Sequence, residues 1–381
     1  MAARGFPKAE FTARLARAQA AMAANGLSAL LLTTEPEIRY FTGFLTRFWE
    51  SPTRVWFVVV PAQGDPIAVI PAIGAHLMAQ TWISDIRTWR APNYADDGIG
   101  LLCETLAEVC GPHGHIGLPD QMETHVLMPL SALRRLEQML LPRKLVSDAA
   151  IVRSLRMVKS EAEIAKIARA CGIADRAYAR VREVAHVGTP LSDVFRGFQG
   201  LCLAEGADFV PYVAGAAGQG GYGDVISPAT DDQLVAGDVL MLDTGLIWDG
   251  YFCDFDRNYS LGAPSAAVAA ANGKLMEATQ AGFEAAQVGA TMADLFHAMN
   301  DIVNAGPDAG RLGHGLGMKL TEWPSIIAQD HTVLEAGMVL TLEPGIDTGA
   351  GKIMVHEENI VIGASGPRFI SDFQPASIRV I

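Results

Sequence analysis

The sequence predicts an α/β protein, with mixed α+β character, made of two domains at residues 1–152 and 153–381. Three observations support this class. The chain has 381 residues, more than one hydrophobic core usually organises. Half of the residues are hydrophobic, so two cores can be filled. Short apolar runs alternate with helical periodicity in the first part, and a new series of helices and antiparallel-looking strands opens at Ser160.

The first domain begins with an amphipathic helix. Apolar residues recur at helical spacing over 8–26, and Gly26 favours the end of that helix. Short apolar runs bounded by turn residues indicate strands, and longer periodic segments indicate helices. The remaining elements expected here are strands at 28–34, 55–61 and 65–71, and helices at 73–82 and 99–110.

The second domain opens with a helix signal, because Ser160 and Glu163 have the spacing of a capping box. Apolar residues at helical spacing continue from it to Tyr178. The other expected elements are helices at 191–205 and 265–287 and strands at 238–243, 250–260, 338–343 and 353–362.

Net charge and cysteine content limit the classes of binding partner and the cell compartment that we expect. A net charge of −13 argues against nucleic acid or an anionic membrane and leaves small molecules as the expected partner. The N-terminus lacks the apolar core of a signal peptide, and no apolar run approaches a membrane span. The five cysteines are scattered and odd in number, which favours reduced thiols and a cytoplasmic location.

Two aspartates sit beside a predicted turn. Asp243 ends the apolar run DVLMLD, and Asp254 follows in GYFCDFDR. The Asp249-Gly250 pair between them favours a hairpin that would make them face each other. Asp256 should share a strand face with Asp254, and two carboxylates on one face repel unless a cation or an arginine lies between them. Capping of turns, and pairing of Asp256 with an arginine elsewhere, remain open alternatives.

Three more residues complete a ligand set. His314 lies between glycines in GHGLG, which lets the backbone come close to a metal. Glu343 ends the apolar run MVLTLE, and Glu357 interrupts IMVHEENIVI, where a buried glutamate needs a partner. Four carboxylates and one imidazole suit two divalent ions such as Mn, Fe, Co or Zn. The ligand candidates are Asp243, Asp254, His314, Glu343 and Glu357.

The ordered motifs resemble the creatinase, aminopeptidase P and prolidase family of metallohydrolases. EIRYFTGF (37–44) and MVKSEAEIAKIARAC (157–171) extend the resemblance over nearly the whole chain. It implies a creatinase-like N-terminal α/β domain followed by a pita-bread catalytic domain. It also implies that the five candidates bind two metal ions and that Glu343 takes a proton during catalysis.

The chain departs from the family at three catalytic positions. Thr321, in TEWP, stands where family peptidases have a second histidine, and the stretch near Ile226 lacks another. Asp256 replaces the usual threonine after the second aspartate. Because both histidines serve the substrate carbonyl or proton transfer, Xaa-Pro hydrolysis should be weak. Asp256 and Thr321 are therefore candidate catalytic residues of a rebuilt proton-transfer set.

The resemblance implies a hydrolase of the Xaa-Pro peptidase type, which cleaves a C–N bond in a dipeptide or a small nitrogenous solute by a metal-bridging hydroxide. One alternative is a lyase, such as a dimethylsulfoniopropionate lyase, with Asp256 or Tyr222 as base. Another is a non-catalytic binding protein, which would have lost ligands that this chain keeps.

Substrate contacts are expected from a loop in the first domain. Residues 46–57 mix Arg47, Trp49 and Arg54 with large apolar groups, which suits an interface or a substrate-covering loop. Family enzymes of this form often pair such a loop with the partner's active site, so the chain is expected to be a homodimer. A cluster packed within its own domain is the alternative. Tyr222 is a further expected substrate contact.

Overall fold

The computed structural model describes residues 3–51, 54–306, 310–374 and 376–381. The chain divides into two compact units, Ala3–Arg156 and Met157–Ile381. The domain boundary expected between residues 152 and 153 falls inside helix α6 (Ile151–Met157). We refer to the two units as the N-terminal unit and the catalytic unit.

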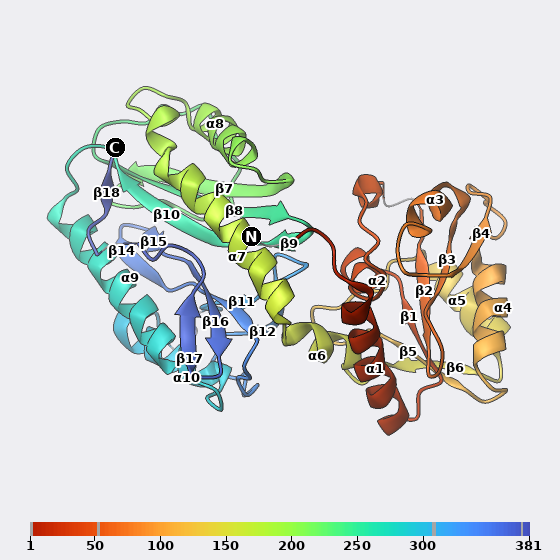
Figure 1. Ribbon diagram of the computed structural model, residues 1–381. Helices are drawn as coiled ribbons and strands as arrows, with labels where there is room; N and C mark the ends of the chain where they lie inside the picture. Colours follow the sequence, from red (N-terminus) through yellow and green to blue (C-terminus); the bar gives the residue numbers. More distant parts are fainter. Residues whose placement is uncertain (1–2, 52–53, 307–309, 375) are drawn as a thin grey trace. The chain divides into compact units, whose positions relative to one another are not determined.

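The N-terminal unit is built on one six-stranded sheet of mixed direction, in the order β4-β3-β2-β1-β5-β6. Its core lies between this sheet and helices α4 and α5 (Figure 1). The strands are β1 (Ala29–Leu32), β2 (Phe57–Pro61), β3 (Ile67–Pro71), β4 (Asp85–Trp89), β5 (His115–Leu118) and β6 (Lys144–Ser147). The helices are α1 (Lys8–Ala24), α2 (Glu35–Thr42), α3 (Ala75–Met78), α4 (Ile99–Val109) and α5 (Leu130–Leu140), with short 3₁₀ turns at Arg47–Glu50 and Ala72–Gly74.

The helix expected at 73–82 is shorter than predicted. Thr81 ends it, because its hydroxyl donates to the carbonyl of Met78 at 2.7 Å and accepts from the amide of Ile83 at 3.2 Å. A threonine side chain that bonds nearby backbone groups competes in this way with the helical ladder.

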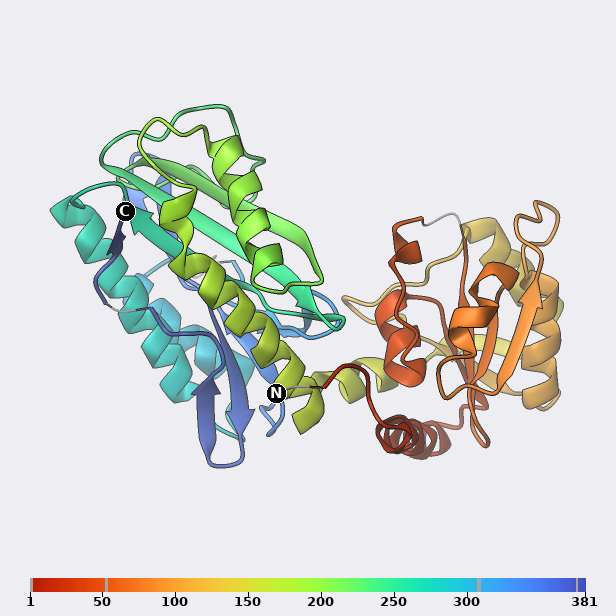
Figure 2. The ribbon, with the colours of Figure 1, turned by 45° about the horizontal axis from the view of Figure 1, so that its top comes forward.

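The catalytic unit contains two larger sheets, each covered by a pair of helices (Figures 1 and 2). The first has the order β18-β10-β8-β7, with β9 paired to β8, and packs against α7 and α8. Its elements are α7 (Glu161–Ala179), α8 (Leu191–Ala204), β7 (Phe209–Gln219), β8 (Asp238–Trp248), β9 (Tyr251–Phe252), β10 (Phe255–Ser260) and β18 (Arg379–Val380).

The second sheet has the order β12-β11-β13-β16-β17 and lies with the ribbon β14-β15 beside α9 and α10. Its buried face shares a core with these helices. The elements are α9 (Ala266–Ala285), α10 (Met292–Val303), β11 (His314–Gly315), β12 (Glu322–Ser325), β13 (Val339–Leu342), β14 (Gly345–Gly349), β15 (Lys352–Val355), β16 (Glu358–Gly363) and β17 (Gly366–Phe369).

Two local predictions are confirmed. Ser160 and Glu163 form a capping box in which each side chain bonds the other's backbone amide, so α7 begins where expected. Asp249 and Gly250 both have positive φ, 48° and 77°, which is the two-residue turn that matches the twist of a hairpin. This turn joins β8 to β9.

Two expected strands are wrong as continuous elements. The segment 250–260 is broken at Cys253-Asp254, between β9 and β10. The segment 353–362 is broken at His356-Glu357, between β15 and β16, which belong to different sheets. Each break holds one of the predicted metal ligands, Asp254 or Glu357.

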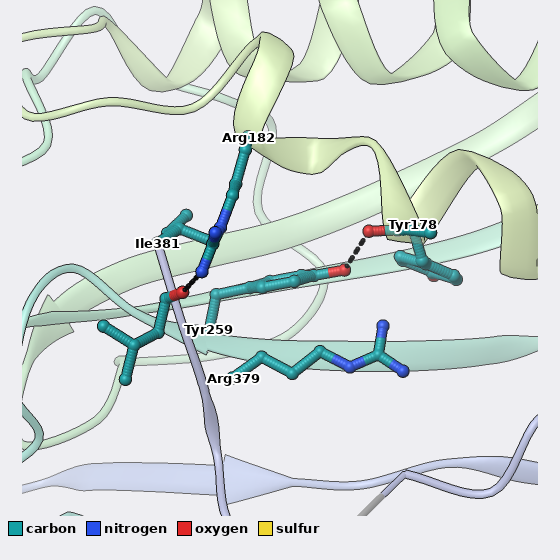
Figure 3. A pocket seen from close by; sticks show the side chains of 7 residues that line it. Tyr178, Arg182, Tyr259, Arg379 and Ile381 are labelled. Atoms are coloured by element: carbon teal, nitrogen blue, oxygen red, sulfur yellow. Dashed lines mark hydrogen bonds between the residues drawn. The ribbon is translucent and has the colours of Figure 1, made fainter.

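The C-terminal strand β18 lies beside a cavity of about 440 Å³ in the catalytic unit (Figure 3). Arg182 donates to the carbonyl of Val380, and the hydroxyl of Tyr259 donates to the carbonyl of Tyr178 at 2.8 Å. The first bond joins β18 to the 3₁₀ turn after α7, and the second joins β10 to α7, while β18 pairs in parallel with β10. Among the described residues, no helix has the length and apolar character needed to cross a membrane.

Candidate metal centre

The first two ligand candidates come from neighbouring strands of one sheet. Asp243 lies in β8, directly opposite Asp256 of β10. Asp254 precedes β10 by one residue, so it lies diagonally from Asp243 rather than opposite it. Asp243 is 9% and Asp254 4% exposed. Burial of two neighbouring carboxylates requires a compensating charge.

His314 comes from the second sheet and is oriented by its own backbone. Gly313 has φ 144°, and a Cβ there would lie 2.3 Å from the carbonyl oxygen of Thr341, so only glycine fits. The Nδ1 atom of His314 lies 2.8 Å from the carbonyl of Gly315. This leaves Nε2 to face Asp254 and Glu343, at 3.3 Å and 2.9 Å. A backbone contact of this kind sets the tautomer of a metal-binding histidine.

The five candidates meet in two groups of three. Asp254, His314 and Glu343 form one, and Asp243, Asp254 and Glu357 form the other. Within each group the potential ligand atoms lie within 4.8 Å of one another. Asp254 belongs to both groups, so two cations placed there would be neighbours.

Two observations indicate that the five candidates suit bound cations: oxygen atoms without a hydrogen-bond partner, and raised pKa values. Oδ1 of Asp243 and Oε2 of Glu357 are buried and have no hydrogen-bond partner. Burial and the surrounding carboxylates raise the pKa of both Asp243 and Glu357 well above the usual range. The cluster therefore does not hold its full negative charge without added positive charge. Carboxylate oxygens with one imidazole suit divalent ions such as Mn, Fe, Co or Zn.

His314 partly compensates the charge of its own group. Burial disfavours its imidazolium, but Glu343 and Asp254 outweigh burial and raise the pKa of His314 to about 10. Burial also raises the pKa of Glu343, yet His314 and the hydroxyl of Thr341 outweigh it and lower that pKa to about 2. One imidazolium thus offsets one of the two carboxylate charges in the group of Asp254, His314 and Glu343, whereas the group of Asp243, Asp254 and Glu357 has no cationic member.

Asp256 is fully buried beside the cluster but does not join either group. Its Oδ1 atom accepts the amide of Glu357 at 2.6 Å and lies 3.5 Å from Nδ1 of His356. Its Oδ2 atom lies 3.4 Å from the side-chain amide of Asn258. These contacts favour a supporting role for Asp256 over contact with substrate.

Tyr222 and Thr321 lie in different settings. Tyr222 is 1% exposed, and its hydroxyl accepts the amide of Val355 at 2.7 Å and donates to Asn258 at 3.2 Å. This placement makes it a brace within the fold and gives no support to the expected substrate contact. Thr321 is half-buried just before β12. Ile226, near the other missing histidine, is 80% exposed.

The expected substrate contacts of the first domain belong to the N-terminal unit. Trp49 packs on Trp56, with ring centroids 5.8 Å apart, and Phe44 and Phe48 contact the same ring. Arg47 is exposed and lies 3.2 Å from Glu50, and Arg54 is half-buried. The aromatic contacts correspond to the alternative of a cluster packed within its own domain.

Three residues near the centre were not predicted from the sequence. Tyr212 lies in β7 opposite Gly245, on the sheet face of Asp243, and burial with the cluster's carboxylates raises its pKa. The charge of Arg311 opposes the burial that raises the pKa of Asp254 and adds to the lowering of the pKa of Glu343. Asn359 bonds the main chain of Asp254. The β7–β8 register could have indicated Tyr212, but the other contacts depend on the fold.

Comparison with known proteins identifies a family for each unit. The model of metallopeptidase family M24 matches residues 165–364, and that of the creatinase/prolidase N-terminal domain matches residues 14–158. A probable dipeptidase PepE of Mycobacterium tuberculosis is 32% identical over 357 residues, 91% of this chain and 90% of the relative. A Xaa-Pro dipeptidase of Pyrococcus horikoshii is 32% identical over 203 residues, 51% of this chain and 57% of the relative.

Solved structures show the same two-domain fold. Dipeptidase PepE from Mycobacterium ulcerans has a TM-score of 0.85 at 29% identity and covers 99% of both chains. Prolidase from Thermococcus sibiricus has a TM-score of 0.86 at 20% identity, with 97% of this chain and 99% of that chain covered. These relatives are peptidases, so they give no support to the lyase alternative. The chain belongs to metallopeptidase family M24 and is a metal-dependent hydrolase of the creatinase and prolidase type.

Proposed function

We propose that this protein is a dipeptidase whose catalytic centre holds two divalent ions. The observation that carries the proposal is the pair of ligand groups that share Asp254. The orphaned oxygens of Asp243 and Glu357 support it, because a buried carboxylate oxygen without a donor suits a cation. Manganese, iron, cobalt and zinc all tolerate this donor set. The dipeptide substrate is supported by the relatives named dipeptidase.

Two bound cations would supply Lewis acidity and a water of lowered pKa. The chain's own residues would then handle protons and orientation. Glu343 lies 2.9 Å from Nε2 of His314 within one ligand group, so its carboxylate is placed to accept the proton that water loses. The hydroxyl of Thr341 donates to Oε1 of Glu343 and fixes that carboxylate. Glu343 would return the proton to the departing amine.

Two residues at the centre suit the substrate's charged and polar ends. Arg311 is exposed, and its charge reaches Asp254 and Glu343, so a substrate carboxylate at the mouth of the centre would meet a guanidinium. Tyr212 is half-buried, with its hydroxyl near Asp243. Thr321 cannot replace the imidazole that family enzymes place there, so dipeptides other than Xaa-Pro should be preferred.

The test is metal depletion followed by reconstitution. Protein stripped with a chelator should lose hydrolysis of free dipeptides and recover it with Mn(II), Co(II) or Zn(II), with a break at two ions per chain. The dipeptide panel should include Xaa-Pro members and N-acetylated members as matched controls. Full activity after depletion would contradict the proposal, as would a break at one ion.

We also propose a cytoplasmic homodimer. All five cysteines carry free thiols, which supports a reducing compartment. Arg47 is exposed, and Phe48 and Trp49 are half-buried, so part of this segment remains accessible for an interface. Light scattering of the full chain decides the oligomeric state, and a monomeric mass at working concentration would exclude the dimer.

A further inference from the structure

Two ligand residues of the centre lie where the strand ladders stop. Asp254 occupies the break before β10, and Glu357 occupies the break before β16. These strands belong to different sheets and do not pair with each other. A buried main chain outside a ladder still needs hydrogen-bond partners. At this seam the partners are side chains.

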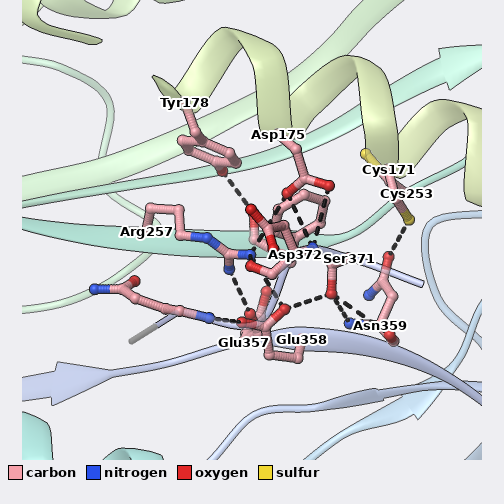
Figure 4. Close-up of polar contacts among 12 residues, drawn as sticks. Cys171, Asp175, Tyr178, Cys253, Arg257, Glu357, Glu358, Asn359, Ser371 and Asp372 are labelled. Carbon is pink, nitrogen blue, oxygen red and sulfur yellow. Dashed lines mark hydrogen bonds and ion pairs between the residues drawn. The ribbon is translucent and has the colours of Figure 1, made fainter. Parts of the chain in front are cut away.

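The main chain of Glu357 is held by two consecutive residues of β10. Oδ1 of Asp256 accepts the amide of Glu357 at 2.6 Å. Nη1 of Arg257 donates to the carbonyl of Glu357 at 3.1 Å (Figure 4). Both side chains are buried, at 0% and 1% exposure. The peptide groups on both sides of this ligand are therefore fixed from the opposite sheet.

The main chain of Asp254 is held in the reverse direction. Its amide donates to Oδ1 of Asn359 at 3.0 Å, and its carbonyl accepts from the side-chain amide of the same residue. Asn359 lies in β16, two residues after Glu357, and is fully buried. Its Oδ1 atom also accepts from the thiol of Cys171 at 3.2 Å (Figure 4). Each sheet thus clamps the ligand carried by the other.

The side chains that hold the main chains of Glu357 and Asp254 are linked by further hydrogen bonds. Glu358 accepts from Arg257 at 3.1 Å and from the hydroxyl of Ser371. The oxygen of that hydroxyl accepts the amide of Asn359 at 2.9 Å. His356, fully buried, lies between Asp256 and Glu358, with its Nε2 atom 3.1 Å from Oε1 of Glu358. Hydrogen bonds through Glu358 and Ser371 therefore join the two sets of contacts that hold Glu357 and Asp254.

We propose that Asp256 and Asn359 are positioning residues, Asp256 for one metal position and Asn359 for both. Asp256 fixes Glu357 and so governs the position of Asp243, Asp254 and Glu357. Asn359 fixes Asp254, which serves both positions, and so governs both. This inference deepens the proposed function and rests on its two-ion centre. Partners outside the ligand set typically change metal affinity by roughly 10- to 100-fold when they are removed.

The test titrates variants of the full chain with cobalt(II). Calorimetry and visible absorption report the binding of each ion. Asp256→Leu removes the acceptor for the amide of Glu357, whereas Asp256→Asn keeps one and removes only the charge. We expect Asp256→Leu to bind one ion with unchanged affinity and the second roughly 10- to 100-fold more weakly. Asp256→Asn should keep two ions of nearly wild-type affinity. Asn359→Leu should lower the affinity for both ions.

A structural role alone would give a different pattern. It would lower the unfolding temperature in chelator and weaken both ions equally in every variant, which would overturn the inference. Two unchanged affinities in Asp256→Leu would overturn it as well. If Asp256→Leu does not fold, Asp256→Ser, whose side chain is too short to reach the amide, carries the same expectation. A wild-type chain that binds fewer than two ions would refute the proposed centre itself, which is a separate result.

Discussion

Replacement of Asp243 by asparagine should change stability in opposite directions with and without metal. Asp243 is buried among Asp254, Asp256 and Glu343, and burial together with these charges raises its pKa well above the usual range. Asparagine keeps the shape and removes one charge. Each unit by which the pKa is raised corresponds to about 1.4 kcal/mol that the ionised form costs the folded protein. Asp243→Asn should therefore stabilise the protein without metal by about 1 kcal/mol or more.

With metal the sign reverses, because Asp243 belongs to only one ligand group. Loss of one ion, at free metal a hundredfold above its dissociation constant, removes about 2.7 kcal/mol of stabilisation. A unit of the size of Met157–Ile381 responds with about 2–4 °C per kcal/mol. The gain of about 1 kcal/mol without metal offsets part of this loss, so the unfolding temperature in saturating metal should fall by about 3–7 °C relative to the wild type.

Scanning calorimetry in chelator and in excess Mn(II) measures both effects. Asp301→Asn is a matched control, because Asp301 is an exposed aspartate on α10 of the same unit. It should change neither temperature by more than about 1 °C. A destabilised Asp243→Asn protein in chelator would refute the argument, since it would mean that the carboxylate is a structural acceptor and not an uncompensated charge.

Further predictions concern the centre and its surroundings. Asp254→Ala should abolish both metal binding and hydrolysis while the N-terminal unit stays folded; elemental analysis that finds full metal content would exclude Asp254 as a ligand. Thr321→His should raise kcat/KM for Xaa-Pro dipeptides by roughly tenfold or more, part of the hundredfold that one such group supplies; no increase would show that the position is indifferent. Arg311→Met should raise KM for free dipeptides roughly tenfold and leave C-terminally amidated ones unchanged. Burial raises the pKa of Asp175 to about 6 despite Arg257. Because this exceeds the unfolded value, its ionisation costs stability as the pH rises from about 4 to 6. Asp175→Asn should remove that slope in urea unfolding curves and stabilise the protein at pH 7 by about 1–3 kcal/mol.

The candidate ligands could be proposed from the sequence because each motif is local. Asp243 and Glu343 end apolar strands, and His314 sits between glycines that the close approach of Thr341 requires. The capping box at Ser160 and the Asp249-Gly250 turn are local in the same sense. Local sequence signals were therefore enough to predict the start of helix α7, the turn between β8 and β9 and the candidate ligands.

The breaks in the strands could not be predicted, because their cause is distant in sequence. The apolar pattern of IMVHEENIVI continues across Glu357, yet the ladder stops where Asp256, 101 residues away, takes the amide of Glu357. Asn359 likewise takes the main chain of Asp254 from 105 residues away. The alternation argument assumed a continuous strand from 250 to 260, so it missed the break at Asp254 and the backbone amide that occupies the carboxylate of Asp256.

Sharing of Asp254 by two ligand groups has a consequence for metal uptake. The first ion to bind orders the side chain of Asp254, which the second ion also needs. Binding of the second ion therefore loses less conformational entropy. The same ion offsets charge that otherwise disfavours the ionised cluster. Both effects favour cooperative loading, in which chains with one ion are scarce. We therefore expect hydrolysis to rise with metal concentration more steeply than a single-site curve, so that a small change in metal supply switches the enzyme between idle and active populations.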